Sequence, residues 1–136
     1  MLRENLIKTL KRHEGLRLKV YRCPTGKLTV GYGRNLEDRG ITQDEADYLL
    51  VNDIRCVEDA LVKELPYWDK LPATVQDVLI NMGFHMGVPG LLKFRKTLGY
   101  IEEGNWIEAS REMLNSRWAK QTPGRARELA EIIRKT

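Results

Sequence analysis

Residues 12–34 read RHEGLRLKVYRCPTGKLTVGYGR, and this stretch differs in pattern from the rest of the chain. Apolar and polar residues alternate in two short runs, which is the periodicity of β-strands. The alternating apolar residues are Leu16, Leu18, Val20, Leu28, Val30 and Tyr32. Between the runs, Pro24 has a fixed φ and Gly26 tolerates a positive φ, as a tight turn requires. The stretch therefore predicts a β-hairpin.

The strand periodicity also predicts which side chains share a face of this hairpin. Because residues two apart point to the same side, Leu16, Leu18 and Val20 are expected to face the core. Cys23 and Thr29 then fall on the opposite face. The hairpin is thus expected to present a thiol and a hydroxyl to solvent.

A helix is predicted immediately before the hairpin, and it ends at an acidic residue. Its apolar stripe consists of Leu2, Leu6, Ile7 and Leu10. Glu14 precedes Gly15, a residue typical of helix ends. The C-terminal end of a helix carries partial negative charge, which favours the protonated form of a carboxyl group. Because glycoside hydrolysis needs an acid that protonates the leaving oxygen, Glu14 is a candidate general acid.

The spacing of Glu14, Cys23 and Thr29 resembles the Glu-Asp/Cys-Thr catalytic pattern of the phage-type, T4-like lysozymes and endolysins. Two further segments agree with this resemblance. Residues 81–87, NMGFHMG, resemble the central buried helix of that family, and residues 116–126, SRWAKQTPGRA, resemble its signature near the C-terminus. Together the three segments cover the chain from end to end.

The resemblance implies an α+β, mainly α, lysozyme-like fold, in which a small β-hairpin lobe is joined by a long helix to a helical lobe. Residues 1–136 would form a single domain. The hairpin region would cover about residues 14–41, and residues 1–13 and 42–136 would be helical. Because residues 34–41 form a very short connection, the β lobe is expected to be trimmed, with little third strand.

By the same resemblance, Glu14, Cys23 and Thr29 are the catalytic residues, and Thr29 helps to place the attacking water. Cys23 stands where most relatives have Asp. A thiol is mostly protonated at neutral pH, so its use as a base requires a lowered pKa, for which Arg22 and Lys27 are the candidate causes. The alternative is that Cys23 is a small turn residue of no chemical consequence.

Further residues are assigned supporting roles by resemblance. Arg125 matches the arginine that contacts the catalytic acid. Its charge would oppose the effect of the helix end on the pKa of Glu14, so the direction of that pKa shift stays open. His85 is either a polar residue at a helix end or a catalytic base. Trp118 lines the cleft or belongs to the core. Arg34 and Asp53 are expected to form a structural ion pair.

Beyond the hairpin, the sequence predicts a series of helices. Residues 42–45, TQDE, form a capping box, and the helix that they open should end near Leu65, because Pro66 disfavours helical backbone before it. A central buried helix is indicated by Val75, Val78, Leu79, Met82 and Met86. Further helices are predicted over residues 91–103, from Trp106 after the stop and N-cap at Gly104 and Asn105, and from Thr122 and Pro123. The last helix should bury Ala126, Leu129, Ala130 and Ile133.

Composition limits the class of protein. A length of 136 residues suits one domain that needs no disulfide, metal or cofactor, so Cys23 and Cys56 are expected to be free thiols. A net charge of +4 favours an anionic partner, and the resemblance makes that partner bacterial peptidoglycan. No apolar run approaches roughly 18 residues, so no stable membrane insertion is expected. We expect a monomer.

Residues 1–15 lack the apolar stretch of a signal peptide. The expected location is therefore the host cytoplasm, until a holin breaches the membrane and gives access to the cell wall. Two rival functions stay open. A lysozyme-like protein could bind peptidoglycan without cleaving it, with Cys23 marking lost catalysis. A basic helical nucleic-acid module is disfavoured, because no helix concentrates basic residues on one stripe.

Overall fold

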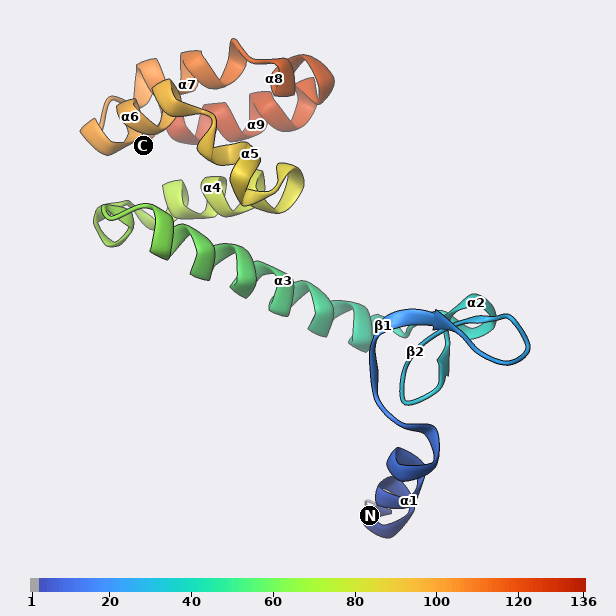
Figure 1. Cartoon of the computed structure of the whole chain (residues 1–136). Coiled ribbons are helices and arrows are strands. Elements are labelled where there is room, and N and C mark those ends of the chain that lie inside the picture. Colours follow the sequence, from blue (N-terminus) through green and yellow to red (C-terminus); the bar gives the residue numbers. More distant parts are fainter. Residues whose placement is uncertain (1–2) are drawn as a thin grey trace. The chain divides into compact units, whose positions relative to one another are not determined.

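A computed structural model describes residues 3–136, and these residues divide into two compact units, Met1–Tyr48 and Leu49–Thr136 (Figure 1). The first unit contains α1 (Glu4–Glu14), β1 (Arg17–Arg22), β2 (Leu28–Gly31), β3 (Arg34–Asn35), α2 (Leu36–Arg39) and the start of α3 (Gln43–Glu64). The second contains the rest of α3, the 3-10 helix η1 (Trp68–Lys70), α4 (Ala73–Met86), α5 (Val88–Leu92), α6 (Arg95–Glu103), α7 (Trp106–Leu114), α8 (Arg117–Gln121) and α9 (Pro123–Arg134). The predicted mainly helical α+β fold is confirmed. The prediction of a single domain stays a prediction.

The first helix, α1, ends where the sequence predicts. Gly15 caps it with a φ of 71°, and the Gly15 N–H donates to the carbonyl of Lys11. Glu14 is therefore the last residue of the helix. Within the described residues, the predicted apolar stripe is exposed at Leu6, Ile7 and Leu10, and Leu2 lies outside the described residues.

The predicted hairpin is part of a three-stranded antiparallel sheet with the order β1-β2-β3. Strand β3 has only two residues, which agrees with a trimmed β lobe. The pairing of β1 with β2 is irregular between Arg17 and Tyr21, because four steps along β1 correspond to two along β2. A ladder interrupted in this way does not carry one alternation of faces through the whole hairpin.

The predicted faces of the hairpin are wrong. Leu16, Leu18 and Val20 are exposed, and Leu18 retains 83% of its accessible surface. Thr29 is buried, with 3% exposed. The reason is that Thr29 lies on the middle strand, opposite Tyr21 of β1 and Asn35 of β3, a third strand for which the two-stranded prediction made little allowance.

Helix α3 begins with the predicted capping box. The Glu45 N–H donates to the hydroxyl of Thr42 over 3.2 Å, and the Thr42 N–H donates to the Glu45 carboxylate over 2.8 Å. The helix ends at Glu64, as Pro66 predicts. The boundary between the two units falls within this helix. Within residues 3–136, no helix combines the length and the apolar character needed to cross a bilayer.

The hydrophobic core lies in the second unit, and helix α4 contributes the most to it. Its fully enclosed side chains are Val75, Val78, Leu79 and Met82, while Met86 is partly buried. Gly83 brings α4 close to α3, because a Cβ at this position would lie 2.9 Å from Val57 Cγ1. Helix α9 buries Ala126, Leu129, Ala130 and Ile133, as predicted.

The single helix predicted over residues 91–103 is wrong, because the chain forms two helices there. Helix α5 ends at Leu92 and α6 begins at Arg95. Phe94 between them turns inward and packs edge-to-face on Trp118, with ring centroids 6.1 Å apart. Burial of an aromatic ring at this point outweighs the continuity of the helix. The predicted stop at Gly104 and N-cap at Asn105 are confirmed.

Candidate active site

The carboxylate of Glu14 lies against the backbone of Gly33 within the first unit. A Cβ added to Gly33 would be 2.8 Å from Glu14 Oε2, a distance that atoms do not reach without displacement. Gly33 also has a φ of +76°, a conformation that favours glycine. Gly33 thus provides the room that the Glu14 carboxylate occupies.

Cys23 lies at the start of the tight turn that joins β1 to β2. The Gly26 N–H donates to the Cys23 carbonyl over 2.7 Å, and the Cys23 N–H donates to the Lys27 carbonyl over 3.0 Å. Pro24 in the second position and Gly26 in the fourth are residues that such turns favour. Cys23 is half-buried, and its Sγ lies 3.0 Å from the hydroxyl of Thr25.

The surroundings of Cys23 lower the pKa of its thiol to about 7. The largest cause is the hydrogen bond with the Thr25 hydroxyl, followed by the backbone groups of Lys27 and Thr25, with a smaller contribution from Thr29. Of the two predicted causes, Arg22 is not among those found, and Lys27 acts through its backbone rather than through its charge. Their charged groups are engaged elsewhere, so neutral hydrogen-bonding groups take this role.

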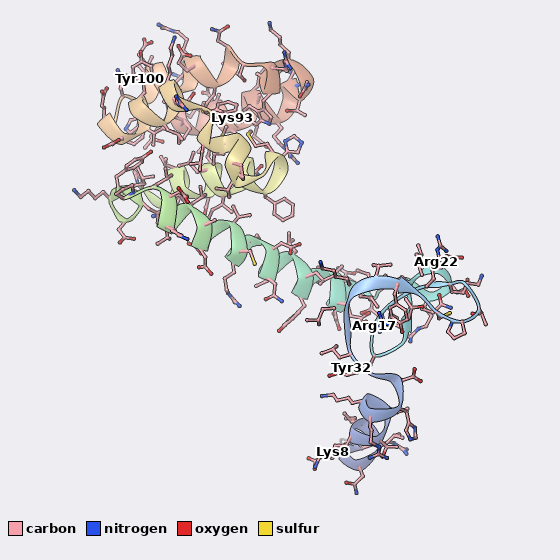
Figure 2. All side chains as sticks on the ribbon, in the orientation of Figure 1. Lys8, Arg17, Arg22, Tyr32, Lys93 and Tyr100 are labelled. Carbon is pink, nitrogen blue, oxygen red and sulfur yellow. The ribbon has the colours of Figure 1, made fainter. Side chains whose placement is uncertain are left out.

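The charged ends of Arg22 and Lys27 have other partners. The Arg22 guanidinium donates to the Gly26 carbonyl over 2.9 Å, at the turn end of the hairpin (Figure 2). The Lys27 ammonium lies 3.3 Å from Asp38 and 3.7 Å from Glu37, both on α2. Helix α2 therefore compensates the charge of Lys27.

Thr29 lies on the strand that follows the turn, and its hydroxyl donates to the Lys27 carbonyl over 2.9 Å. That bond uses the hydroxyl proton and leaves the oxygen lone pairs as acceptors. A hydroxyl held in this way can accept a hydrogen bond from a water molecule. Thr29 is therefore suited to the water-placing role predicted for it, which stays a prediction.

Arg34 has a different partner from the one predicted. Its guanidinium forms two hydrogen bonds with Glu45, of 2.6 and 2.7 Å, and a third with the Gly40 carbonyl. Asp53 lies eight residues further along α3, which is about 12 Å along a helix axis. Asp53 belongs to the second unit, so the predicted Arg34–Asp53 pair stays a prediction. The hydrogen bonds from Arg34 lower the pKa of Glu45 to about 2.

His85 and Trp118 contact each other in the second unit. The Trp118 Nε1–H donates to His85 Nδ1 over 3.1 Å. His85 is exposed in the last turn of α4, while Trp118 is 7% exposed and belongs to the core. Of the two alternatives for His85, its place at a helix end is confirmed. Its use as a base stays a prediction.

Arg125 is exposed near the start of α9 and lines a pocket of about 310 Å³. The other lining residues are Leu50, Ile54, Asp77, Ile80, Asn81 and Phe84. Glu14 and Arg125 belong to different units, so their predicted contact stays a prediction.

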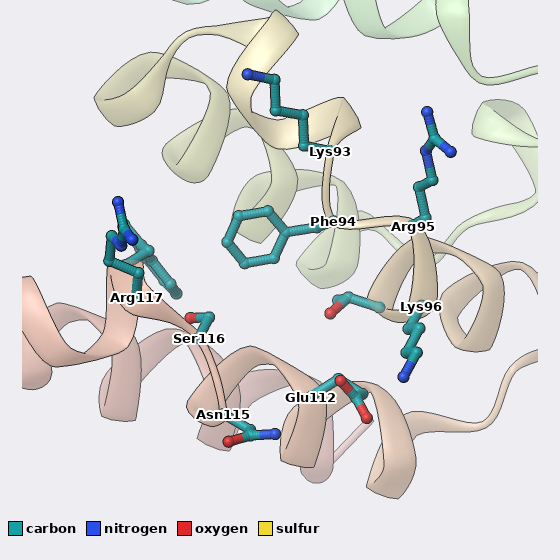
Figure 3. A pocket seen from close by; sticks show the side chains of 10 residues that line it. Lys93, Phe94, Arg95, Lys96, Glu112, Asn115, Ser116 and Arg117 are labelled. Carbon is teal, nitrogen blue, oxygen red and sulfur yellow. The ribbon is translucent and has the colours of Figure 1, made fainter.

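A second pocket, of about 450 Å³, is also part of the second unit (Figure 3). Phe94 points into it, with Glu112 and Asn115 across from the ring. Lys93 and Arg95 point away from the ring. Trp118 lines the pocket as well, so it is both a core residue and a lining residue. An aromatic wall with a polar rim suits a ligand that has apolar and polar parts.

Within the described part of the chain, no three His, Cys, Asp or Glu side chains are grouped so that they could hold a metal ion.

A comparison of the sequence with known protein families shows which family the chain belongs to. The family model described as phage lysozyme matches residues 11–135. The chain belongs to the phage lysozyme family. It is therefore a lysozyme-like peptidoglycan hydrolase, an enzyme of the glycoside hydrolase class.

Individual relatives of the chain come from a eukaryote and from phages. It is 29% identical to probable T4-type lysozyme 1 of Dictyostelium discoideum in an alignment that covers 91% of this chain and 90% of that protein. It is 33% identical over 117 residues to the endolysin of Acyrthosiphon pisum secondary endosymbiont phage 1, covering 82% and 75%. With the pre-baseplate central spike protein Gp5 of Enterobacteria phage T4 the identity is 30% over 157 residues, covering 95% of this chain but 27% of that protein.

Two residues around the candidate site were missed in the sequence, and so was one contact of a third. Thr25 carries a hydroxyl two positions after Cys23, a spacing that a tight turn converts into a contact. Gly33 is the second glycine of a Gly-Tyr-Gly run, which signals a close approach of backbone to another group. Glu45 was recognised as a capping residue, and its second partner, Arg34, carries no signal in the sequence.

Proposed function

We propose that this protein is a muramidase, which cleaves the β-1,4 bond between N-acetylmuramic acid and N-acetylglucosamine in peptidoglycan. The observation that carries the proposal is the placement of three groups within one unit: Glu14 against the backbone of Gly33, the Cys23 sulfur 3.0 Å from the Thr25 hydroxyl, and Thr29 on the strand after the turn. The surroundings of Cys23 lower the pKa of its thiol to about 7. A thiol with this pKa is about half ionised at neutral pH and can act as a base.

The proposed reaction divides two proton transfers between two residues. Glu14 donates its proton to the glycosidic oxygen as the bond between that oxygen and C1 of the muramic acid breaks. A water oxygen forms the new bond to C1, and the Cys23 thiolate takes the proton that this water loses. Thr29 accepts a hydrogen bond from the water and fixes its position. Glu14 and Cys23 then exchange protons with solvent and regain their starting states.

We also propose a role in lysis of the host, by analogy with the relative whose name is endolysin. In this proposal the enzyme accumulates in the host cytoplasm and reaches the wall when a holin opens the membrane. Expression in a Gram-negative host tests this directly. Lysis should follow addition of chloroform or co-expression of a holin, and cells that lyse without either treatment would contradict the proposal.

Digestion of purified sacculi identifies the bond that is cut. A muramidase leaves muramic acid at the new reducing ends, so reduction with borohydride should yield muramitol. Glucosaminitol would indicate a glucosaminidase. Products without a new reducing end would exclude hydrolysis at either sugar and contradict the proposal.

The role of Glu14 is tested in the same assay by Glu14→Gln, which keeps the shape of the side chain but removes the proton that it donates. We expect loss of nearly all release of reducing ends, with an unchanged circular dichroism spectrum. Glu4→Gln, at the other end of α1, is the matched control and should keep full activity. If neither wild type nor control cleaves sacculi but both bind them, the protein is a peptidoglycan-binding relative that has lost catalysis.

A further inference from the structure

The hydroxyl of Thr25 is committed to the sulfur of Cys23. Thr25 Oγ1 lies 3.0 Å from Cys23 Sγ, and no other hydrogen bond of this hydroxyl is found among residues 3–136. In the protonated thiol either atom can be the donor. In the thiolate the sulfur has no proton, so the hydroxyl must donate. The contact therefore favours the ionised form of the sulfur.

The backbone of the turn holds this contact in place. Two backbone hydrogen bonds close the turn that contains Cys23 and Thr25. The Gly26 N–H donates to the Cys23 carbonyl, and the Cys23 N–H donates to the Lys27 carbonyl. Pro24 lies between the two residues and restricts the chain further. The separation of sulfur and hydroxyl thus depends on a rigid turn as well as on side-chain rotamers.

Charged groups around the turn do not replace this contact. From β1, the Arg22 guanidinium bonds to the Gly26 carbonyl. Lys27, which follows the turn, is paired with Asp38 and Glu37 of α2. Glu37 also accepts the N–H of Leu28 on β2. The two cations nearest in sequence are therefore occupied, and the Thr25 hydroxyl, 3.0 Å from the sulfur, is the side chain that lowers the pKa of Cys23 most, ahead of Thr29.

We propose that Thr25 is a positioning residue for the reaction, because its hydroxyl donates a hydrogen bond to Cys23 Sγ and holds the sulfur as the thiolate that accepts a proton from the attacking water. This inference rests on the proposed role of Cys23 as the base. When the sulfur takes the proton, the hydroxyl turns and accepts a hydrogen bond from the new S–H group. No other reactant is required.

Alkylation of the thiol tests the contact without reference to catalysis. In a Cys56→Ser background Cys23 is the single thiol, and its rate of reaction with iodoacetamide is measured from pH 5.5 to 9.5. Thr25→Val keeps the branched shape and removes the hydroxyl, so the midpoint should rise from about 7 toward the ordinary thiol value near 8.5. At pH 7 the alkylation rate should fall by up to about fifteenfold, the change in thiolate fraction over that range.

Two further variants separate the hydroxyl from the fold. Thr25→Ser retains the hydroxyl and should restore the midpoint. Thr9→Val makes the same substitution at a partly exposed threonine of α1, whose hydroxyl donates to the Asn5 carbonyl, and should leave the midpoint unchanged. If Thr25→Val fails to fold, as judged by circular dichroism, Thr25→Ala takes its place with the same expectation.

The pH profile of sacculus hydrolysis, measured with Cys56→Ser and its Thr25→Val derivative, connects the contact to the reaction. We expect the rising limb to move up in pH together with the alkylation midpoint. An unchanged alkylation midpoint would overturn the role of Thr25 and leave Cys23 as the base. A moved alkylation midpoint with an unchanged hydrolysis profile would overturn Cys23 as the base, and the positioning role with it.

Discussion

At the scale of single residues, the candidate site depends on close approaches that involve neutral groups. The pKa of Cys23 is lowered by the hydroxyl of Thr25 and by backbone groups, although the charged residues Arg22 and Lys27 lie close to it in the sequence. Glu14 gains its position from the absence of a side chain at Gly33. In both cases the important neighbour is small, and its effect comes from where the backbone places it.

The pKa of Cys23 leads to a prediction about pH. The base is active as the thiolate, so sacculus hydrolysis by the wild type should rise with pH through about 7. Cys23→Asp should retain substantial activity and move this rising limb to below about pH 5, because a carboxyl group ionises near 3.9. Cys23→Ser should be inactive, because a hydroxyl does not ionise in this range. Initial rates at constant ionic strength provide the measurement, and full activity of Cys23→Ser would show that the thiolate is not used.

Gly33 leads to a second prediction at this scale. Gly33→Ala should abolish most of the activity, because the new Cβ would displace the Glu14 carboxylate. The positive φ should cost about 1–2 kcal/mol of stability as well. Gly40→Ala is the matched control, since Gly40 has a φ of +64° but its Cβ would meet no atom within 4 Å. Both variants should lose similar stability in thermal melts, and equal activity in the two would contradict the contact with Glu14.

The sequence predicts the chemical groups of the site better than their surroundings. Glu14 at a helix end follows from Gly15, and Cys23 in a turn follows from Pro24 and Gly26. The burial of Thr29 could not be predicted in the same way, because it depends on a two-residue third strand whose periodicity is too short to detect. Register irregularities such as the one in β1 leave no pattern of their own.

At the scale of elements, the junction between the sheet and α3 is fixed by one carboxylate. Glu45 caps α3 through Thr42 and also binds the guanidinium of Arg34 in β3. The capping box was predicted from four consecutive residues, because its partners are local in sequence. The pair with Arg34 joins residues eleven positions apart in different elements, and several acidic residues of α3 fit such a pattern equally well.

This junction leads to a prediction about acid stability. The pKa of Glu45 in the folded protein is about 2, below the ordinary value near 4.3, so its ionised form stabilises the fold. That stabilisation is fully present above about pH 4.3 and is lost as the pH falls toward 2. Glu45→Gln should therefore melt below the wild type at pH 7, and the two melting temperatures should converge near pH 2.

The control for this series is Asp47→Asn, two residues further along the same helix, where no ion pair is found among the described residues. Its melting temperature should follow that of the wild type across the pH range. A Glu45→Gln curve that stays parallel to the wild type from pH 7 to 2 would show that the Arg34 pair does not contribute to stability.

At the scale of the whole molecule, the buried apolar side chains belong to one unit. Of residues 3–48, Thr29 alone is buried, whereas the second unit encloses side chains from α3, α4, α7 and α9. Helical spacing predicted most of this core, because a 3.6-residue period over ten or more residues is a strong signal. It failed at Phe94, where packing on Trp118 interrupts a periodic run.

This distribution predicts where truncation of a side chain matters. Met82 is fully buried in α4, so Met82→Ala should lower the free energy of unfolding by about 2–5 kcal/mol, through lost burial and the cavity left behind. Leu18 on β1 keeps 83% of its surface exposed, so Leu18→Ala should change it by no more than about 0.5 kcal/mol. Met82→Leu, which conserves volume, should cost less than about 1.5 kcal/mol.

Urea titrations followed by circular dichroism compare the three variants, and the comparison decides whether Leu18 of the hairpin faces a core or solvent. If Leu18→Ala proves as costly as Met82→Ala, Leu18 faces a core, as its alternation in the sequence suggested. If it is nearly neutral, the stability of this lysozyme resides in the helices around α4, and the exposed strand residues are free to vary.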